Sequence, residues 1–572
     1  MQVLTQIPET AQFDVAVIGA GGAGMAAALF AALHGAKVLL IERTSHVGGT
    51  TAWSAGTTWI PGSHHAASVN PDDTLAEAAR YLDNAVGERS PPALRQAFLN
   101  QGAKAVAWIE EKTQVKFRPY PKHPDYISDL GGSTLNGRAL EPLPFDARVL
   151  GELAHLVRPP IPEFTVLGGM MVDRTDINHL LGMTASMASL RHSARILLRH
   201  LGDRLQYPRG MRWVMGNALV GRLLYSLSQQ AGVSLALDTT VDGFGKGAHG
   251  IESLTLQKRG QRCTVKVSAG VVLASGGFNR NPALRQSMLP GADIQWCPAA
   301  PGHTGAAHAL AQGLGARYGS GGLSHAFWAP VSIRKRPDGS QAVFPHFVMD
   351  RAKPGMITLN QTGERFVNES TSYHLFGLAM QDKASVPAYL ICDAHALRQY
   401  GIGMVRPGGK GLAPFLADGY LTEGASLAEL ASKLGMPVAT AQASIERFNA
   451  SAAQGVDGDF GRGETAYQRN LGDPASATPN PCLGAITQGP FYAVRLYPGD
   501  IGAATGFVTD AHARVLDTEG QAIGGLYAIG NDMQSIMGGV YPAPGITIGP
   551  SIVFAYLATL HMMSMKREVH AR

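Results

Sequence analysis

The chain has 572 residues, of which 45% are hydrophobic and 16% charged, and its formal net charge is +5. So small a charge on so long a chain argues against a nucleic-acid-binding protein, and the length favours two domains over one. The cysteines are Cys263, Cys297, Cys392 and Cys482. They form no C-x-x-C, zinc or haem-attachment spacing, so we expect no metal site and a reducing compartment. The start of the chain lacks a basic-then-apolar signal pattern, which predicts a cytoplasmic protein.

A glycine-rich turn between two apolar runs is the most informative stretch near the amino terminus. The apolar run 15–18 predicts a strand buried on both faces, and the alanine-rich residues 25–34 predict a helix. A second buried strand is expected over 37–41, ending at Glu42. This order of strand, glycines, helix, strand and acid is typical of a Rossmann-type dinucleotide-binding unit.

The glycines of this turn have separate roles in such a unit. Gly19 permits the tight turn, and Gly24 lets the helix pack closely on the strand. Gly21, followed by Gly22, lets a pyrophosphate approach the backbone at the positive end of the helix. Glu42 is placed to accept hydrogen bonds from an adenosine ribose, which predicts FAD or NAD rather than a 2′-phosphorylated cofactor.

The segment after Glu42 is rich in small and hydroxyl residues. Such residues can line an extended cofactor without blocking it, although a plain polar loop would have the same composition. The expected cofactor contacts in this segment are Arg43, Gly49, Thr50, Thr51, Ser54, Ala55 and Gly56. The pair His64-His65 that follows has no ligand partner at a useful spacing in the sequence, so we interpret it as part of a loop.

Helical and extended patterns alternate through the next part of the chain. Helices are expected over 72–111 and 217–229, and a strand that passes beside the adenine is expected over 233–241. The methionine-rich residues 149–187 favour gap-filling core over a lid that contacts substrate. The basic stretch 191–212 has the pattern of an amphipathic helix. A solvated helix is favoured there over one that lies on a membrane surface, and both interpretations stay open.

The run 271–278 predicts another buried strand, which enters a glycine turn. Ala274, Ser275 and Gly276 in this turn are expected to contact the cofactor. From about 281 to 484 the pattern changes to short strands and to helices such as 427–434 and 439–448. Near the end, the apolar residues 551–563 are too few to span a bilayer.

One complete dinucleotide fingerprint is present, and strand-rich character returns after Gly489. We therefore expect an α/β protein with a discontinuous, Rossmann-type FAD-binding domain and an inserted α+β catalytic domain. The expected boundaries are 1–284, 285–487 and 488–572. An enzyme that binds both flavin and NAD(P)H would show two fingerprints, so one non-covalently bound FAD is expected. A quinone-like molecule or a protein would then accept its electrons.

Two further stretches narrow the function. The glycine pair at 48–49 resembles the flavin-side arm of the fumarate reductase–succinate dehydrogenase flavoprotein superfamily. The run 363–374, Gly-Glu-Arg-Phe-Val-Asn-Glu-Ser-Thr-Ser-Tyr-His, resembles a motif of its dicarboxylate reductases, which place an arginine proton donor where this chain has Tyr373. In the run 537–550 those enzymes have a histidine and an arginine, and this chain has Tyr541 and Gly545 instead. Without these cations a dianionic substrate would lack its counter-charges, which argues against fumarate or succinate.

With these replacements the chain resembles the 3-ketosteroid Δ1-dehydrogenases over nearly its whole length. The resemblance also rests on Pro124-Asp125-Tyr126, on 498–502 and on 525–531. It implies that the Tyr541 hydroxyl and the Gly545 N–H hold the substrate C3 carbonyl. It further implies that Tyr373 takes a proton from C2, that Tyr126 supports Tyr373, and that hydride passes from C1 to flavin N5. The remaining FAD contacts that it implies are Val241, Gly530, Asn531, Thr547 and Ile548.

Chemistry supports these roles, because removing a proton beside a carbonyl builds negative charge on its oxygen, which two aimed donors stabilise. The sequence thus predicts an FAD-dependent dehydrogenase that forms a 1,2-double bond in an apolar ketone such as a 3-ketosteroid. A Δ4-forming ketosteroid dehydrogenase and an enone reductase of the same superfamily remain alternatives, as does a non-catalytic flavin electron-transfer protein. No nucleic-acid partner is expected, and contact with a membrane surface stays open.

Overall fold

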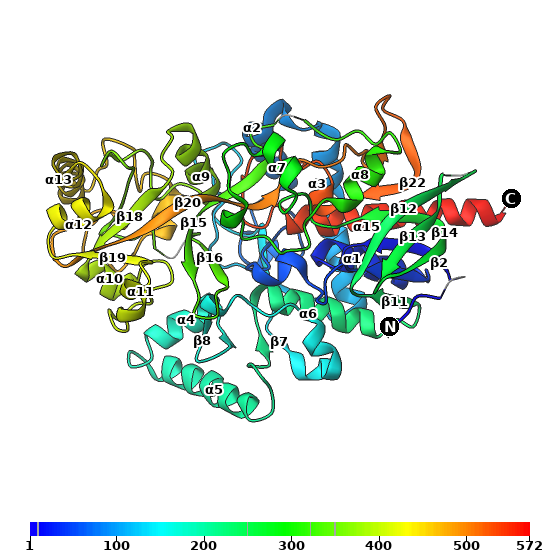
Figure 1. Cartoon of the computed structure of the whole chain (residues 1–572), viewed down its shortest axis with the longest axis horizontal. Coiled ribbons are helices and arrows are strands. Elements are labelled where there is room, and N and C mark those ends of the chain that lie inside the picture. Colours follow the sequence, from blue (N-terminus) through cyan, green and yellow to red (C-terminus); the bar gives the residue numbers. More distant parts are fainter. Residues whose placement is uncertain (9–10, 249, 321, 348–349, 572) are drawn as a thin grey trace.

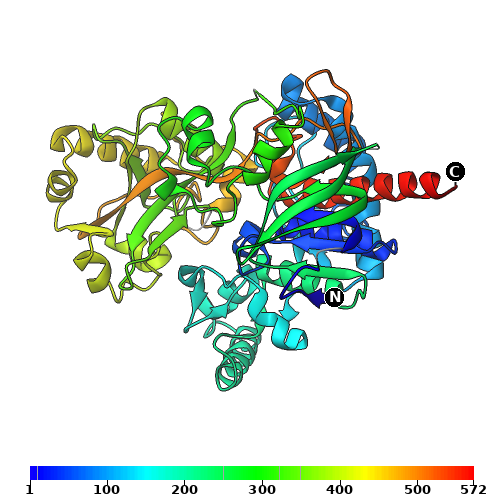
Figure 2. The same cartoon turned by 45° about the vertical axis from the view of Figure 1, so that its right-hand side comes forward.

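The computed structural model describes residues 1–8, 11–248, 250–320, 322–347 and 350–571 (Figure 1). A nine-stranded sheet and a six-stranded sheet organise these residues, and three smaller sheets join them. Figure 2 shows the six-stranded sheet and its helices on the left, the nine-stranded sheet on the right, and a third, smaller part below.

The nine-stranded sheet contains both strands of the glycine-rich unit. Its order is β1 (Gln2–Val3), β11 (Val233–Ala236), β3 (Val38–Ile41), β2 (Gln12–Ile18), β14 (Gln261–Leu273), β13 (Gly250–Lys258) and β12 (Thr239–Gly247), with β22 (Ala522–Ala528) beside β14 and β21 (Arg514–Leu516) beside β22. Strands β1, β11, β3, β2, β14 and β22 pair in parallel. Because parallel strands end at one edge, this sheet brings the turns after β2, β3, β14 and β22 together.

Helix α1 (Gly22–Leu33) follows β2 directly, as the sequence predicts, and packs on the large sheet. Its other neighbours are α6 (Met215–Ser228) and α15 (Ile548–Ala571). The Phe30 ring lies 5.3 Å from the ring of Tyr556 on α15. Helix α15 is longer than the apolar run 551–563 suggested, and its residues 548–567 are long and apolar enough to cross a membrane. However, 61% of this apolar stretch is buried inside the protein, as expected of a core helix.

Two expected elements are divided in the structure. The expected strand 233–241 is interrupted at Asp238, whose φ of +50° breaks the extended backbone, so β11 and β12 lie at different places in the sheet. The expected helix 72–111 is two helices, α2 (Leu75–Val86) and α3 (Pro92–Lys112). The break coincides with Gly87, which has a φ of +59°.

The six-stranded sheet is entirely antiparallel. Its order is β16 (Gln341–Pro345), β15 (Ala326–Lys335), β20 (Phe491–Ala503), β18 (Ala388–Asp393) and β17 (Met356–Leu359), with β19 (Leu421–Gly424) also beside β20. Its helices include α9 (Tyr373–Asp382), α10 (Ala394–Tyr400), α11 (Ala413–Ala417), α12 (Leu427–Leu434), α13 (Val438–Gln454) and α14 (Ala466–Leu471). Helix 427–434 was predicted with these bounds. Strand β20 pairs wholly within this sheet, and the next strand of the large sheet along the chain is β21.

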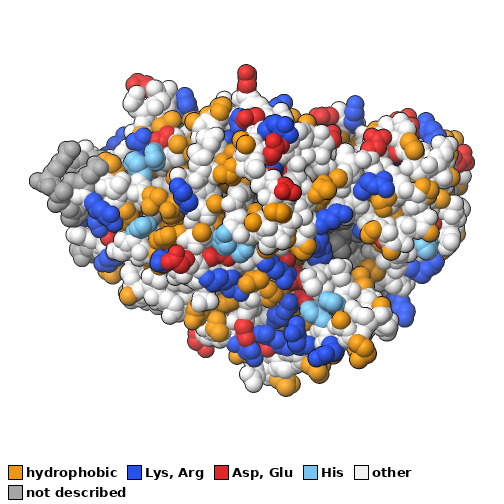
Figure 3. Space-filling view, turned by 180° about the vertical axis from the view of Figure 1, so that it is seen from behind, with side chains coloured by type: hydrophobic (Ala, Val, Ile, Leu, Met, Phe, Trp, Pro, Cys, Tyr) orange, Lys and Arg blue, Asp and Glu red, His pale blue; other side chains and the backbone are white. Residues whose placement is uncertain are grey.

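The third part contains α4 (Arg174–Leu181) and α5 (Met187–Arg204), with short strands β7 (Phe145–Asp146), β8 (Thr165–Val166), β9 (Met170–Met171) and β10 (Arg212–Trp213). It projects from the main body below α6 (Figure 1). Helix α5 leaves several apolar side chains in solvent, among them Leu198 and Leu201, which are 69% and 62% exposed. Figure 3 shows basic and apolar side chains close together along this lower edge.

Candidate active site

A cavity of about 670 Å³ lies where the large sheet, the six-stranded sheet and α4 meet. The expected cofactor residues that line it are Gly19, Gly21, Gly22, Glu42, Arg43, Gly49, Thr50, Thr51, Ser54, Ala55, Gly56, Val241, Ala274, Ser275, Gly276, Gly530, Asn531, Thr547 and Ile548. The expected catalytic residues on its wall are Tyr126, Tyr373, Tyr541 and Gly545. Gly24 does not line the cavity, and a Cβ there would lie 1.8 Å from the Gly19 carbonyl oxygen. Segments far apart in the chain thus surround one space.

The glycine turn leaves room for a ligand at the start of α1. A Cβ on Gly21 would meet no atom within 4 Å, so the backbone there borders open space. Gly19 has a φ of +108°, and a Cβ there would lie 2.3 Å from the Ala274 carbonyl oxygen. An open cradle at a helix N-terminus fits the pyrophosphate of a dinucleotide.

Glu42 directly follows strand β3 at the cavity and is 7% exposed. Its carboxylate accepts hydrogen bonds from the N–H groups of Ala20 (3.1 Å) and Thr44 (2.9 Å). Arg158, which the sequence analysis missed, also lines the cavity and donates to the Thr44 hydroxyl at 2.9 Å. Burial lowers the pKa of Arg158, while Glu42 raises it. An acid fixed in this way is compatible with the predicted contact to a ribose, and the arginine adds a cation to the same side of the cavity.

Asp532 holds the glycine turn after β14 in place. Its buried carboxylate accepts from the hydroxyl of Ser275, from the N–H of Gly277 at 2.7 Å and from the His308 ring at 2.9 Å. His303 lies against the same turn, with its Nε2 3.3 Å from the Thr50 hydroxyl. Burial lowers the pKa of His303 to about 4, so the ring is neutral. Neither residue was identified from sequence, although Asp532 directly follows the Gly530-Asn531 pair.

Tyr126, Tyr373 and Tyr541 form one buried cluster. The Tyr126 hydroxyl donates to the Tyr373 hydroxyl at 3.2 Å. The Tyr541 ring lies 5.1 Å from that of Tyr373 and 5.8 Å from that of Tyr126, measured between centroids. Burial, with the neighbouring phenols, raises the pKa of Tyr373 well above 10, so the resting group is a neutral phenol.

The loop that carries Tyr541 and Gly545 is held from several sides. The Pro542 carbonyl accepts from the Tyr126 N–H at 2.7 Å and from the Tyr81 hydroxyl at 2.6 Å. Gly545 has a φ of +87°, and its carbonyl accepts from the N–H of Trp59 at 3.2 Å. Among the described residues, none accepts a hydrogen bond from the Gly545 N–H. This N–H is therefore available to a ligand at the cavity wall.

The motifs next to the tyrosines are structural. Asp125 accepts from the indole N–H of Trp59 at 3.0 Å and from Arg138 at 2.9 Å, although burial raises its pKa to about 6. In the other motif, Glu369 is fully buried and pairs with Arg365 at 2.7 Å and with Arg462 at 3.1 Å. These buried ion pairs position the backbone before Tyr373 rather than face the cavity.

Further cations line the cavity outside the glycine turn. Lys353 is half-buried, and its ammonium donates to the Gly472 carbonyl at 2.8 Å. Arg174 on α4 stacks over the Tyr120 ring at 5.2 Å. No carboxylate of the described residues forms an ion pair with either side chain. Lys353 and Arg174 belong to no motif in the sequence, so the sequence did not predict that they line the cavity.

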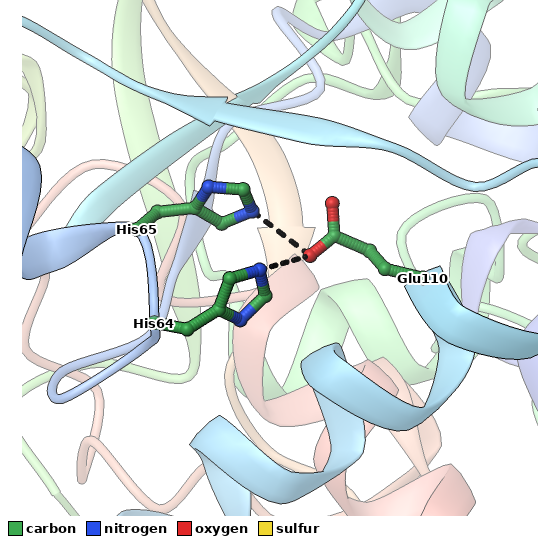
Figure 4. Close-up of side chains that lie close together, drawn as sticks. All are labelled: His64, His65 and Glu110. Atoms are coloured by element: carbon green, nitrogen blue, oxygen red, sulfur yellow. Dashed lines mark hydrogen bonds and ion pairs between the residues drawn. The ribbon is translucent and has the colours of Figure 1, made fainter.

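His64 and His65 lie in a turn, as predicted, but the fold gives them a shared partner that their spacing in the sequence did not reveal. Glu110, on helix α3, presents one carboxylate oxygen to a nitrogen of each ring (Figure 4). None of the three lines the cavity. The partner comes from a helix 45 residues further along the chain, which spacing alone does not reveal.

The FAD binding domain family matches residues 14–548. The 4-oxocyclohex-2-ene-1-carboxylate 5-dehydrogenase of Sinomonas cyclohexanicum is 36% identical over 559 residues, covering 96% of this chain and 93% of that protein. The 3-oxosteroid 1-dehydrogenase of Mycobacterium tuberculosis is 34% identical over 580 residues, covering 96% and 98%.

Among solved structures, 3-ketosteroid Δ1-dehydrogenase from Sterolibacterium denitrificans, in complex with 1,4-androstadiene-3,17-dione, superposes with a TM-score of 0.90 at 31% identity. The match covers 97% of this chain and all of that one. Together with the glycine cradle and the fixed acid, these similarities identify the cofactor as FAD. The chain belongs to the FAD binding domain family of flavoproteins and is similar over nearly its whole length to 3-oxosteroid 1-dehydrogenases.

Proposed function

We propose that the protein oxidises a ring ketone by introducing a carbon–carbon double bond beside the carbonyl, with FAD as oxidant. The observation that carries this proposal is the grouping of two phenols and one free backbone N–H on the wall of the FAD cavity. Bound FAD would supply the hydride acceptor. Every other requirement of the reaction must be met by side chains and backbone of this chain.

The proposed roles follow from the geometry. The Tyr541 hydroxyl and the Gly545 N–H donate to the substrate carbonyl, where negative charge develops as the neighbouring C–H loses its proton. Tyr373 takes that proton. The Tyr126 hydroxyl, 3.2 Å away, donates to the phenolate that Tyr373 must become. Burial of the cluster excludes water, which strengthens both interactions.

A 3-ketosteroid is the first substrate class that we propose, giving a 1,2-double bond. Apolar side chains on the cavity wall suit a fused-ring hydrocarbon: Phe164, Val172, Ile177, Phe327, Phe347 and Leu471. Incubation of the holoenzyme with 4-androstene-3,17-dione and a dye acceptor, with product analysis by mass spectrometry and NMR, tests this assignment. With 5α-androstane-3,17-dione as a second substrate, a 4,5-double bond in the product would instead support the Δ4-forming alternative. Saturation of 4-androstene-3,17-dione by enzyme whose flavin has first been reduced would support an enone reductase. If none of the ring ketones tested reduces the flavin under anaerobic conditions, the proposed dehydrogenase activity is overturned.

A second substrate class is favoured by the cations without ion-pair partners. Lys353 and Arg174 could bind a carboxylate at the far end of a smaller ring ketone, such as the compound named for the relative from Sinomonas. Burial lowers the pKa of Lys353 because it disfavours the charged ammonium. A carboxylate bound beside the ammonium would stabilise the charged form and raise the pKa again.

The carboxylate hypothesis is tested by comparing 4-oxocyclohexanecarboxylate with its methyl ester. If it is correct, the acid bleaches the flavin and the ester does so poorly, and Lys353→Met raises KM for the acid alone. Lys433→Met is the matched control, because Lys433 is an exposed lysine paired with Glu429 at 2.7 Å. Equal rates for acid and ester would contradict the hypothesis.

We also propose that the FAD-binding domain is discontinuous, with residues 285 to about 503 as the inserted catalytic domain. The pairing of β20 within the six-stranded sheet supports this later boundary.

A quinone-like or protein acceptor would reoxidise the flavin. The exposed leucines of α5 support contact with a membrane surface, which vesicle sedimentation would test against Leu198→Gln/Leu201→Gln. We retain a cytoplasmic location as a proposal.

A further inference from the structure

His64, His65 and Glu110 converge on one point outside the active-site cavity (Figure 4). The Nε2 atoms of His64 and His65 lie 3.1 Å and 2.8 Å from the same oxygen, Oε2 of Glu110. All three candidate ligand atoms lie within 4.8 Å of one another. Both rings therefore point the same nitrogen at the same place.

The local fold holds these side chains in position. The histidines follow β4 (Thr58–Trp59) in a turn where Gly62 has a φ of +68° and a Cβ would lie 2.8 Å from the Leu75 side chain. The Ala66 N–H closes that turn by donating to the Ser63 carbonyl at 2.9 Å. Across from them, the second oxygen of Glu110, Oε1, accepts from the Phe117 N–H at 2.8 Å. The carboxylate is thus oriented with Oε2 toward the rings, as an outer-shell donor orients a metal ligand.

The charge balance at this point differs from that of another histidine pair in the chain. His179 and His192 also pack together, with ring centroids 4.4 Å apart, and His192 contacts the Asp176 carboxylate at 2.8 Å. There Arg212 already neutralises Asp176 through bonds of 2.8 Å and 3.2 Å. Within the described residues, no lysine or arginine pairs with the Glu110 carboxylate.

We propose that His64, His65 and Glu110 bind a divalent transition metal ion of the Zn²⁺ class. Two imidazoles and a carboxylate are ligands that Zn²⁺ accepts, and three protein ligands leave further positions for water. With metal–ligand distances of about 2.0–2.2 Å, tetrahedral ligands stand roughly 3.3–3.6 Å apart. The two His–Glu separations of 3.1 Å and 2.8 Å would each widen by less than about 1 Å to reach that spacing, and the two ring nitrogens already lie within 4.8 Å of each other.

Metal binding here would join the turn after β4 to helix α3. The same two elements meet behind the active site, where the Trp59 ring of β4 stacks on Phe98 of α3 at 6.1 Å. None of the three ligands lines the cavity, so the ion would stabilise the fold without entering the reaction. A ligand that binds only the folded state raises the unfolding temperature.

The test uses untagged, FAD-loaded protein that has been treated with EDTA and dialysed. Calorimetric titration with Zn²⁺ is expected to show one site per chain and a raised unfolding temperature. Co²⁺ in its place is expected to give the intense visible bands of a low-coordinate site. Glu110→Gln, which keeps an acceptor for Phe117, and His65→Gln should each weaken Zn²⁺ binding by about tenfold or more.

Two further variants keep the result interpretable. His64→Gln changes a side chain that is 50% exposed, so it tests the site even if substitution at buried Glu110 disturbs folding. His192→Gln is the matched control and should leave Zn²⁺ affinity unchanged. Absence of stoichiometric Zn²⁺ binding, or binding that survives in all three ligand variants, would overturn the proposal.

Discussion

Replacing Tyr541 by phenylalanine is the sharpest test of the proposed chemistry. The change removes one hydroxyl and keeps the ring, whose packing against Tyr373 and Phe327, each 5.1 Å away between centroids, remains. Tyr541 is only 7% exposed, so water does not readily replace the lost donor. Of the two proposed donors to the carbonyl, only the Gly545 N–H would remain. Loss of one such donor costs about 3–4 kcal/mol, or roughly 10²–10³ in turnover.

The assay is anaerobic reduction of the flavin by a ring ketone in a stopped-flow instrument, with FAD content measured from the absorbance spectrum. We expect wild-type FAD content and a reduction rate lower by two to three orders of magnitude. Tyr467→Phe is the control, because its ring lies 4.7 Å from that of Tyr126 but does not line the cavity. A Tyr541→Phe enzyme that reduces its flavin at nearly the wild-type rate would refute the reasoning.

Further predictions concern the base, the loop and the cofactor. Tyr373→Phe should lower the rate of flavin reduction by about 10²–10⁴ while ketone binding persists, because the proton acceptor is lost; an unchanged rate would exclude this role. Burial raises the pKa of Tyr373, so the reactive phenolate is a minor form whose fraction increases with pH. The value of kcat/KM should therefore rise from pH 7 to pH 9 without levelling, and a plateau near neutrality would contradict this assignment. Gly545→Ala should reduce activity and thermal stability together, since its Cβ would lie 2.5 Å from the Thr57 carbonyl oxygen in a backbone with positive φ. Glu42→Gln should weaken FAD binding in equilibrium dialysis and leave the rate of the loaded enzyme unchanged.

Local patterns were sufficient to predict the start of the fold. The apolar run 15–18, the glycines and the alanine-rich helix are encoded within a few residues of one another, and the structure has them as β2 and α1. The tyrosines were found differently, because resemblance to a family supplied positions that local chemistry could not. Any one tyrosine in a sequence is more often a buried ring than a catalytic group.

Contacts between distant segments were the part that the sequence did not reveal. Nothing near His64 points to Glu110, and nothing near Ser275 points to Asp532, 257 residues further along the chain. The sheet to which β20 belongs was also hidden from the sequence. The residues of β20 have ordinary strand composition, and only their hydrogen-bond partners show that the strand joins the six-stranded sheet. Such pairings depend on how the elements pack, which periodicity does not encode.

The distribution of charge around the tyrosine cluster supports a ketone rather than a carboxylate as the group that binds there. The motif before Tyr373 brings Arg365 and Arg462 close by, but Glu369 and Asp457 neutralise Arg365, and Arg462 pairs with Glu369. Neither arginine lines the cavity. The phenols and the Gly545 N–H are neutral donors, which match a carbonyl oxygen that gains charge only during the reaction. A fixed cation at the same place would favour a substrate that is already anionic, so the absence of charge within the tyrosine cluster is itself part of the specificity.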